Sequence, residues 1–437
     1  MKKTFLSYDF RHTAYNQLWR LVSGPLLLIL VPLYLSPEVQ GYWYTFMSLA
    51  ALAIFADMGF SSILLQFSAH EFAYLKFESK KKLIGEKQHL ERLSTLLIFA
   101  MKWSFGMGII AFPIILSVGF MMLAEKQTLI SWMIPWTIYG LASVFVFMNS
   151  MILSFIEGCN SVGEVQKIRF VISFFTTIST GLFLVLGFEL YALAISLLIG
   201  ALSGMGIILY RYQYMLKQLY DLSLNVSHAW KNEILPLTGK YAISWISGYF
   251  IFSIFTPIAF HYYGAIEAGK VGLSMAVCSA IFGIANMWIT IIVPKINMFI
   301  ARKDYQILDP IFRRHLLLAI VTYIFGTVVL FSIILLFGQY LSFSERLVSL
   351  LSLSMIAVGW LLQIIVNSYA VYMRAHKEEP LVIPSFVSGI YIALTTCLIA
   401  LYLPSEYLFI GFLSSYIWVV PWVLILFGKY KGKKIGS

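Results

Sequence analysis

Residues 230–295 read WKNEILPLTGKYAISWISGYFIFSIFTPIAFHYYGAIEAGKVGLSMAVCSAIFGIANMWITIIVPK. Two apolar runs flank the short polar turn HYYGAIEAGK, and Lys240 and Lys295 lie at the outer ends of those runs. A helix needs about 20 mostly apolar residues to cross the hydrocarbon core of a bilayer, and each run reaches that length. The stretch therefore predicts two antiparallel membrane helices joined by a turn at one membrane surface.

The rest of the chain repeats this pattern. Of its 437 residues, 60% are hydrophobic and 12% are charged, whereas soluble domains carry about 25% charged residues. Twelve apolar runs are long enough to span a bilayer, at residues 15–35, 43–66, 96–122, 128–153, 169–188, 191–212, 241–263, 270–293, 316–337, 346–370, 381–402 and 408–427. We therefore predict an all-α polytopic membrane protein with about 12 transmembrane helices.

The distribution of positive charge predicts the orientation, because cytoplasmic loops of membrane proteins are enriched in Lys and Arg. With the N-terminus inside, 27 of the 31 Lys and Arg residues fall in cytoplasmic segments, and the outer connectors hold only Lys126, Lys270 and Arg346. We expect both termini to be cytoplasmic. The net charge of +11 follows from this rule and indicates no nucleic-acid partner, since the basic residues are dispersed among loops. The Lys80–Lys82 cluster instead favours anionic membrane lipids.

The second-longest polar connector, at residues 213–240, separates the first six predicted spans from the last six. We expect an N-terminal six-helix lobe at residues 1–212, a cytoplasmic linker at 213–240 and a C-terminal six-helix lobe at 241–437. An even number of spans in each half permits a parallel repeat about an axis normal to the membrane. Aligning Gly41 with Gly269 places Asp57 beside Asn286, one residue out of register. The alternative is that this match arises by chance.

Several classes of enzyme and metal protein lack their motifs here. No GxxxxGK[ST] loop occurs, so nothing indicates nucleotide hydrolysis, and His70-Glu71 lacks the second histidine of a zinc protease. There is no G-x-S-x-G sequence and no cluster of paired carboxylates of the kind that glycosyl transfer needs. The three cysteines show no metal-binding spacing. We therefore expect no catalytic residues, no metal and no cofactor.

Very few charged residues lie well inside predicted spans, where a charge costs ~2.5–3.5 kcal/mol unless it faces protein or water. Two of them, Arg20 and Asp57, lie at a similar distance from the turn between their spans, so we expect an ion pair or near-pair. The pair is either a lock between two helices or part of a hydrated path for a ligand. Lys240 and Lys102 are further candidates for that path, or else their side chains reach the inner membrane interface.

Uncharged side chains complete the candidate site. Trp245 and Tyr249 share one face of a predicted helix and offer flat rings with polar tips, which suit sugar rings if that face borders a cavity. The alternative is ordinary helix packing. Asn286 is a polar group at membrane depth, where it either contacts a ligand or hydrogen-bonds a neighbouring helix.

The chain resembles the polysaccharide-transporter (Wzx-type) flippases of bacteria, within the superfamily that also holds multidrug antiporters of the MATE type. The likeness rests on FADMGFSSILLQFSAHE at residues 55–71 and on FIEGCNSVGEVQKIRF at 155–170. Above all it rests on residues 230–264, which are followed by AGKVGLS at 268–274. It extends over essentially the whole chain in order and topology.

The resemblance implies two six-helix lobes around a central cavity that opens alternately to either side of the bacterial inner membrane. It implies a non-enzymatic flippase whose cargo is an oligosaccharide, an O-antigen or capsule repeat unit, linked to undecaprenyl pyrophosphate. Other polysaccharide assembly proteins are possible partners on this interpretation. Arg20, Lys240 and Lys102 would then offset the charge of the pyrophosphate. The chain departs from the antiporters in having no well-buried acid except Asp57, which leaves little basis for ion coupling.

Two alternatives stay open. One is a drug or metabolite antiporter of the same fold, for which Asp57 is the only support in the sequence. The other is a membrane-embedded polysaccharide polymerase or ligase, which would need a large outer loop or outward acid and base residues. The short outer connectors argue against that enzyme.

Overall fold

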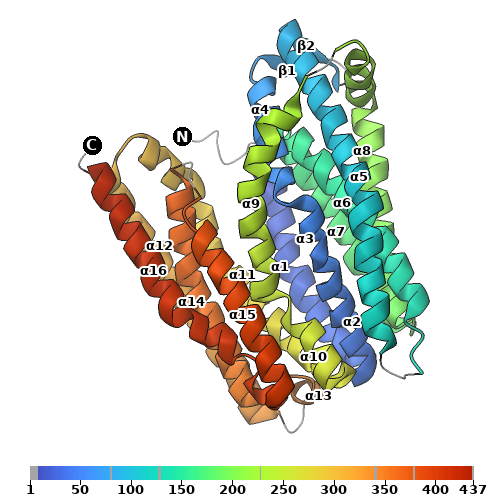
Figure 1. Ribbon diagram of the computed structural model, residues 1–437, viewed down its shortest axis with the longest axis vertical. Helices are drawn as coiled ribbons and strands as arrows, with labels where there is room; N and C mark the ends of the chain where they lie inside the picture. The colour runs from blue at the N-terminus through green and yellow to red at the C-terminus, as the bar shows by residue number, and fades with distance from the viewer. Residues whose placement is uncertain are drawn as a thin grey trace. The chain divides into compact units, whose positions relative to one another are not determined.

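The computed structural model is almost entirely helical (Figure 1). It describes residues 8–78, 81–125, 129–226, 228–338, 342–376 and 379–435. Within these ranges, one two-stranded hairpin is the only sheet. The all-α fold class is confirmed.

The number of membrane-crossing helices agrees with the predicted twelve. In the described part of the chain, 11 helices are long and apolar enough to span a bilayer, and the count rises to 12 if a pair bent by 43° is one span. The principal helices are α1 (Tyr8–Tyr34), α2 (Pro37–Ala50), α3 (Ile54–Asp57), α4 (Phe60–Phe72), α5 (Lys87–Ala124), α6 (Met133–Gly158), α7 (Val162–Val185), α8 (Leu190–Ser223), α9 (Trp230–Phe252), α10 (Phe255–Tyr263), α11 (Ala265–Ala301), α12 (Tyr305–Phe337), α14 (Leu350–Arg374), α15 (Val382–Tyr402) and α16 (Ile410–Ile435). Short pieces are η1 (Ala51–Ala53), α13 (Ser342–Glu345) and η3 (Ser405–Tyr407).

The span predicted at residues 43–66 is the clearest departure. Instead of one helix, the structure has α2, η1, α3 and α4, with a sharp break at Met58 and Gly59. Both residues have positive φ angles, 47° and 74°, which end one helix before the next begins. An apolar run does not by itself reveal such a break, because Met58 is a good helix former.

The chain forms two compact units. Unit 1 comprises the residues up to Tyr34 together with Leu49–Trp245, and unit 2 comprises Leu35–Ser48 together with Ile246–Ser437. Most of the segment expected as a linker, 213–240, is helical and belongs to unit 1, since α8 continues to Ser223 and α9 begins at Trp230. The first part of α2 belongs to unit 2 although it follows α1 directly in the sequence.

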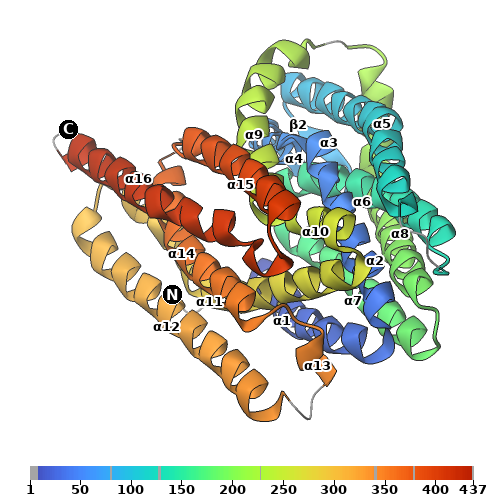
Figure 2. The ribbon, with the colours of Figure 1, turned by 60° about the horizontal axis from the view of Figure 1, so that its bottom comes forward.

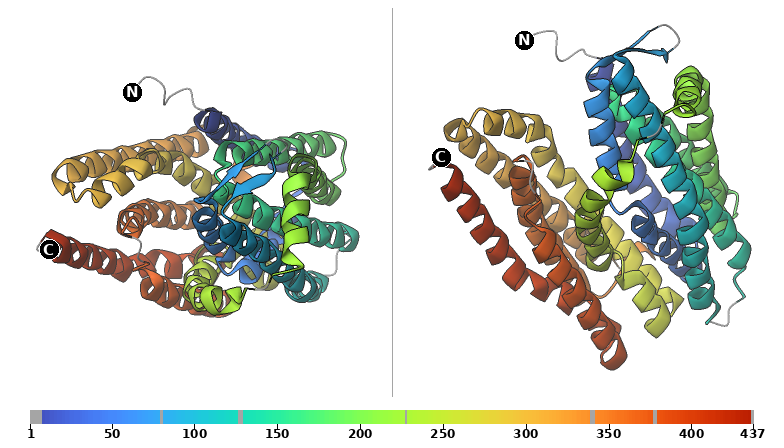
Figure 3. Two further views of the ribbon diagram at one scale, coloured as in Figure 1. Left: turned by 90° about the horizontal axis from the view of Figure 1, so that it is seen from above. Right: turned by 45° about the horizontal axis from the view of Figure 1, so that its top comes forward.

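In unit 1, α1 packs along α7, while α6 lies between α4 and α8 (Figure 2). The core between these helices is apolar, with Phe60, Phe155 and Ile208 fully buried. Beyond α4 and α5 lies the hairpin of β1 (Leu75–Phe77) and β2 (Leu83–Gly85), paired antiparallel (Figure 3). The side-chain amide of Gln218 holds this hairpin to α8 by bonding both the N–H and the carbonyl of Leu83, each at 2.8 Å.

In unit 2, α11 packs against α12 and α14, and α14 packs against α16. Aromatic rings fill the interior: Phe255 lies 4.9 Å from Phe409 and 5.7 Å from Phe412, and Trp360 lies 5.1 Å from Phe252 between ring centroids. These rings join α10, α14 and the start of α16 into one core.

The two glycines aligned as a repeat lie against each other in unit 2. The amide of Gln40 donates to the carbonyl of Gly269 at 3.0 Å, and a Cβ on Gly269 would come within 3.0 Å of the Gly41 nitrogen. A Cβ on Gly41 would overlap the carbonyl of Ala265. The absence of side chains therefore allows the backbones of α2 and α11 to touch.

Candidate functional site

Two successive residues with positive φ angles, Met58 and Gly59, form the break between α3 and α4 in unit 1. A Cβ on Gly59 would lie 2.8 Å from the Cβ of Tyr241 and 3.3 Å from the indole of Trp245. Gly59 therefore satisfies two requirements, a positive φ angle and close approach to α9.

Asp57 is the last residue of α3, and its side chain hydrogen-bonds across the break to Ser61 of α4. Its Oδ1 accepts the backbone N–H of Ser61 and its Oδ2 accepts the Ser61 hydroxyl, each at 2.9 Å. The half-buried carboxylate thus lies at the N-terminus of α4, where the exposed N–H groups of the helix favour negative charge.

The expected ion pair between Arg20 and Asp57 is wrong for the described part of the chain. Asp57 is bonded to Ser61, and the exposed Arg20 side chain forms no ion pair with any residue that the structure describes. The expectation assumed that Arg20 faces the helix after it. Instead the buried side of α1 faces α7, where Asn16 donates to Gln166 at 2.8 Å and Trp19 donates to Ser173 at 3.2 Å.

Trp245 is the candidate residue that the structure brings near Asp57. Its side chain is 39% exposed, and its indole lies over Gly59, two residues from Asp57. A carboxylate, a hydroxyl and the pyrrole edge of an indole thus lie beside one helix break within unit 1. The carboxylate can bind a cation through its charge.

Tyr249 and Asn286 lie in unit 2. Tyr249 is buried at 6% exposure, with its ring edge-on to Phe250 at 5.6 Å. Asn286 on α11 accepts a hydrogen bond from the amide of Asn367 on α14 at 2.9 Å. The interhelical bond weighed as the alternative for Asn286 is therefore present.

The three cationic candidates, Arg20, Lys102 and Lys240, lie on three different helices. Lys102 on α5 is exposed and forms no ion pair with the residues that the structure describes. The side chain of Lys240 lies outside the described residues, although its backbone belongs to α9. Arg20 and Lys102 are thus two unpaired cations on membrane-spanning helices of unit 1.

Of the basic cluster expected to meet anionic lipids, Lys80 lies outside the described residues. The neighbouring Lys81 folds back, with its Nζ 4.9 Å from the ring centre of Phe77 and 5.6 Å from that of Tyr212. Burial and the nearby Arg211 charge lower the pKa of Lys81. Lys82 is exposed.

A buried polar network in unit 1 escaped the sequence-based prediction. Glu71 at the end of α4 is 1% exposed, and its two oxygens contact His89 Nδ1 at 2.7 Å and Arg92 Nε at 2.8 Å. Tyr74 stacks on the His89 ring at 3.9 Å. A buried carboxylate needs such partners, because an unpaired one would be very costly.

The same network holds the first turn of α9. The Arg92 guanidinium lies 4.8 Å from the ring of Trp230 and 3.4 Å from Glu233, and the Trp230 indole donates to Thr95 at 3.0 Å. The hydrogen-bonded partners are 18 to 141 residues apart along the chain, so no local spacing could have indicated this cluster.

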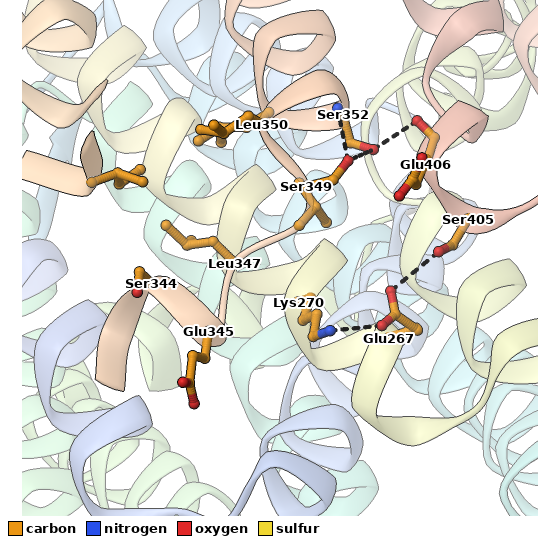
Figure 4. Close-up of a pocket in the computed structure, with 13 residues that line it drawn as sticks. Glu267, Lys270, Ser344, Glu345, Leu347, Ser349, Leu350, Ser352, Ser405 and Glu406 are labelled. Carbon is orange, nitrogen blue, oxygen red and sulfur yellow. Dashed lines mark hydrogen bonds and ion pairs between the residues drawn. The ribbon is translucent and has the colours of Figure 1, made fainter. Parts of the chain in front are cut away.

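Unit 2 contains a polar cavity of about 500 Å³ (Figure 4). In its wall, Glu267 pairs with Lys270 at 2.8 Å and accepts from Ser405 at 3.3 Å. The Ser352 hydroxyl donates to the Glu406 carbonyl at 2.7 Å. Hydroxyls and carboxylates lining one cavity suit a hydrated or hydroxyl-rich molecule better than an apolar one.

No family model matches the chain, and no curated protein matches it by sequence. Solved structures do match it over nearly its whole length. One is an inward-facing multidrug resistance MATE family transporter of the MOP superfamily, with a TM-score of 0.66 and 15% identity, covering 95% of this chain and 96% of the other. Another is a MATE in the bent conformation, with a TM-score of 0.54 and 14% identity, covering 98% and 96%.

A third match is a MOP superfamily transporter from Pyrococcus furiosus, described as having a binding pocket of reverse polarity that suggests a different function. Its TM-score is 0.54 at 14% identity, with 97% of each chain covered. At this level of identity the three likenesses show that the chain has the MATE-type fold.

Proposed function

We propose that this chain is a multi-pass membrane transporter that exports a drug-like or metabolite cargo in exchange for a cation. The observation that carries the proposal is the whole-chain likeness to MATE transporters, which covers 95% of this chain and 96% of the solved structure. The sequence pattern favoured the flippase, but the structural neighbours support the antiporter better.

Asp57 is the residue that we assign to cation coupling. It is a half-buried carboxylate on a membrane-spanning segment, bonded only to Ser61 among the residues that the structure describes. The Ser61 hydroxyl and the indole of Trp245 beside Gly59 would complete the environment of a bound proton or metal cation.

A flippase for lipid-linked oligosaccharide is the second candidate. It is supported by Arg20 and Lys102, two exposed cations on spans of unit 1 that lack an acidic partner among the described residues. An anionic pyrophosphate would neutralise such cations, whereas a cationic drug would be repelled by them.

The deciding experiment compares two variants in two assays. In a bacterial strain lacking its own drug exporters, the antiporter predicts that the chain raises efflux of a cationic dye, and that Asp57→Asn abolishes this efflux at unchanged protein level. In the native host, the flippase predicts that deletion traps lipid-linked repeat units on the cytoplasmic leaflet. It also predicts that Arg20→Ala fails to restore export.

The results of the two assays decide between the two candidate functions. Dye efflux that is absent in the first assay, together with trapped repeat units in the second, would overturn the antiporter. Unchanged surface polysaccharide in the deletion strain would overturn the flippase. Lys217→Ala removes an exposed cation of α8 and is the matched control for Arg20→Ala, since it should leave both assays unchanged.

A further inference from the structure

A groove of about 500 Å³ runs between α1 and α7 in unit 1. The residues that line it are His12, Tyr15, Leu18, Trp19, Val22, Lys167, Phe170 and Val171. Both helices belong to candidate membrane spans, at Arg11–Tyr34 and Val162–Val185. The groove therefore runs along two helices that are long and apolar enough to span a membrane.

Most of the groove is apolar. Leu18 and Val22 are one helical turn apart and are 58% and 60% exposed. The indole of Trp19 also lines the groove, with its ring 5.9 Å from that of Phe170 and its N–H donated to the hydroxyl of Ser173. A hydrocarbon chain would cover these side chains along the helix axis.

One end of the groove is cationic. Lys167 lines it beside the imidazole of His12, and the charges of Arg11, Arg211 and Asp9 all lie near enough to act electrostatically on His12. All five residues are at the end of unit 1 where α1 and α7 begin and where the second half of α8 passes.

The acids at this end are already bonded. Asp9 accepts the backbone N–H of Gly163 at 2.8 Å, and Glu157 pairs with Arg169 at 2.8 Å. Glu164 accepts the Tyr8 hydroxyl at 2.7 Å and pairs with Arg211.

By contrast, Lys167 and Arg11 form no ion pair with any residue that the structure describes. Lys167 and Arg11 are therefore two cations at this end that are not held in an ion pair by any described residue, and Asp9 is the one nearby acid whose bond is to a neutral N–H group.

We propose that this groove binds an anionic phospholipid, with the phosphate at Lys167, Arg11 and His12 and one acyl chain along Leu18 and Val22. The apolar length suits the chain, and the unpaired cations suit the headgroup at the membrane surface. A zwitterionic lipid would bring a positive group to the same cations. The site is separate from the cargo assignments above and does not depend on them.

The test is a lipid-binding titration of the purified full-length chain, stripped of lipid, followed by native mass spectrometry with phosphatidylglycerol and phosphatidylcholine. We expect phosphatidylglycerol to bind more tightly. Lys167→Ala should weaken its binding about fivefold, the factor for one basic residue near a membrane surface, and Lys167→Glu should weaken it further. Lys217→Glu changes an exposed cation outside the groove and should bind like the unmodified chain.

A second variant addresses the acyl chain. Val22→Trp adds volume inside the groove without changing charge, and it should lower binding of phosphatidylglycerol while the fold is retained. The proposal is overturned if Lys167→Glu and Lys217→Glu weaken binding equally, or if phosphatidylcholine binds as tightly as phosphatidylglycerol. Dye efflux or polysaccharide export that fails with intact lipid binding would overturn only the proposed function.

Discussion

Asp57 has a structural role at the break and, in the function proposed above, a chemical role as well. Its carboxylate accepts the backbone N–H and the hydroxyl of Ser61 in the first turn of α4, next to the positive φ angles of Met58 and Gly59. A side chain that caps a helix inside a membrane segment is needed for stability and yet carries a charge available to a cation.

Substitutions at Asp57 should separate these two roles. Asp57→Asn keeps an oxygen that accepts the Ser61 N–H, so the free energy of unfolding should change little. Asp57→Ala removes the cap and should lower the free energy of unfolding by ~1 kcal/mol. The measurement is the midpoint of thermal unfolding in detergent.

Ser61→Ala is the control for that experiment, because it removes the hydroxyl bond and retains the backbone bond. A loss of stability in Asp57→Asn as large as in Asp57→Ala would contradict the capping role. Equal transport by Asp57→Asn and the unmodified chain would contradict the coupling role.

At the scale of helices, contact between backbones holds α2 to α11. Gly41 and Gly269 are where the two helices touch, and the bond from Gln40 to the Gly269 carbonyl fixes their register. Small residues give close approach that larger ones exclude, and in a membrane this packing replaces the hydrophobic effect between helices.

A methyl group at this contact should be destabilising. Gly41→Ala would place its Cβ against the Ala265 carbonyl, and overpacking of this kind costs ~1–3 kcal/mol. Gly283→Ala is the matched control, because nothing lies within 4 Å of a Cβ there, and it should be neutral or stabilising. Thermal unfolding in detergent measures both, and equal midpoints for the two variants would refute the close contact.

A second contact between elements lies in unit 1, at the first turn of α9. Glu71, Arg92 and Trp230 connect the end of α4, the start of α5 and the first turn of α9. This network holds the first turn of α9 to unit 1, to which residues 230–245 belong, while the rest of the same helix belongs to unit 2.

At the scale of the whole chain, membrane-spanning helices account for the composition. The described residues contain 11 such helices, or 12 with the bent pair of α9 and α10. With 12 spans both termini would lie on one side, and the distribution of Lys and Arg predicts that this side is the cytoplasm.

Cysteine labelling tests that orientation. Cys159 and Cys278 are buried and Cys397 is partly exposed, so Cys397→Ser gives a background of low reactivity. On it, Ser405→Cys should react with an impermeant maleimide in intact cells, whereas Asp221→Cys should react only after permeabilisation. The opposite labelling pattern would show that the orientation predicted from Lys and Arg is wrong.

The sequence by itself determined the class of protein and the approximate position of nearly every span. This was possible because the length of an apolar run is a local property, and a bilayer selects for it directly. The orientation could be predicted as well, because the number of Lys and Arg residues in each loop is also a local property of the sequence. Asp57 was also recognisable, since an acid within an apolar run is costly wherever the helix packs.

Only the tertiary structure decided which residues meet. It separated Arg20 from Asp57, placed Trp245 over Gly59, paired Asn286 with Asn367, and buried Glu71 against His89 and Arg92. It also assigned Leu35–Ser48 to unit 2. These contacts join residues far apart along the chain, and they depend on which helix face turns toward which neighbour, a choice that an almost uniformly apolar sequence leaves open.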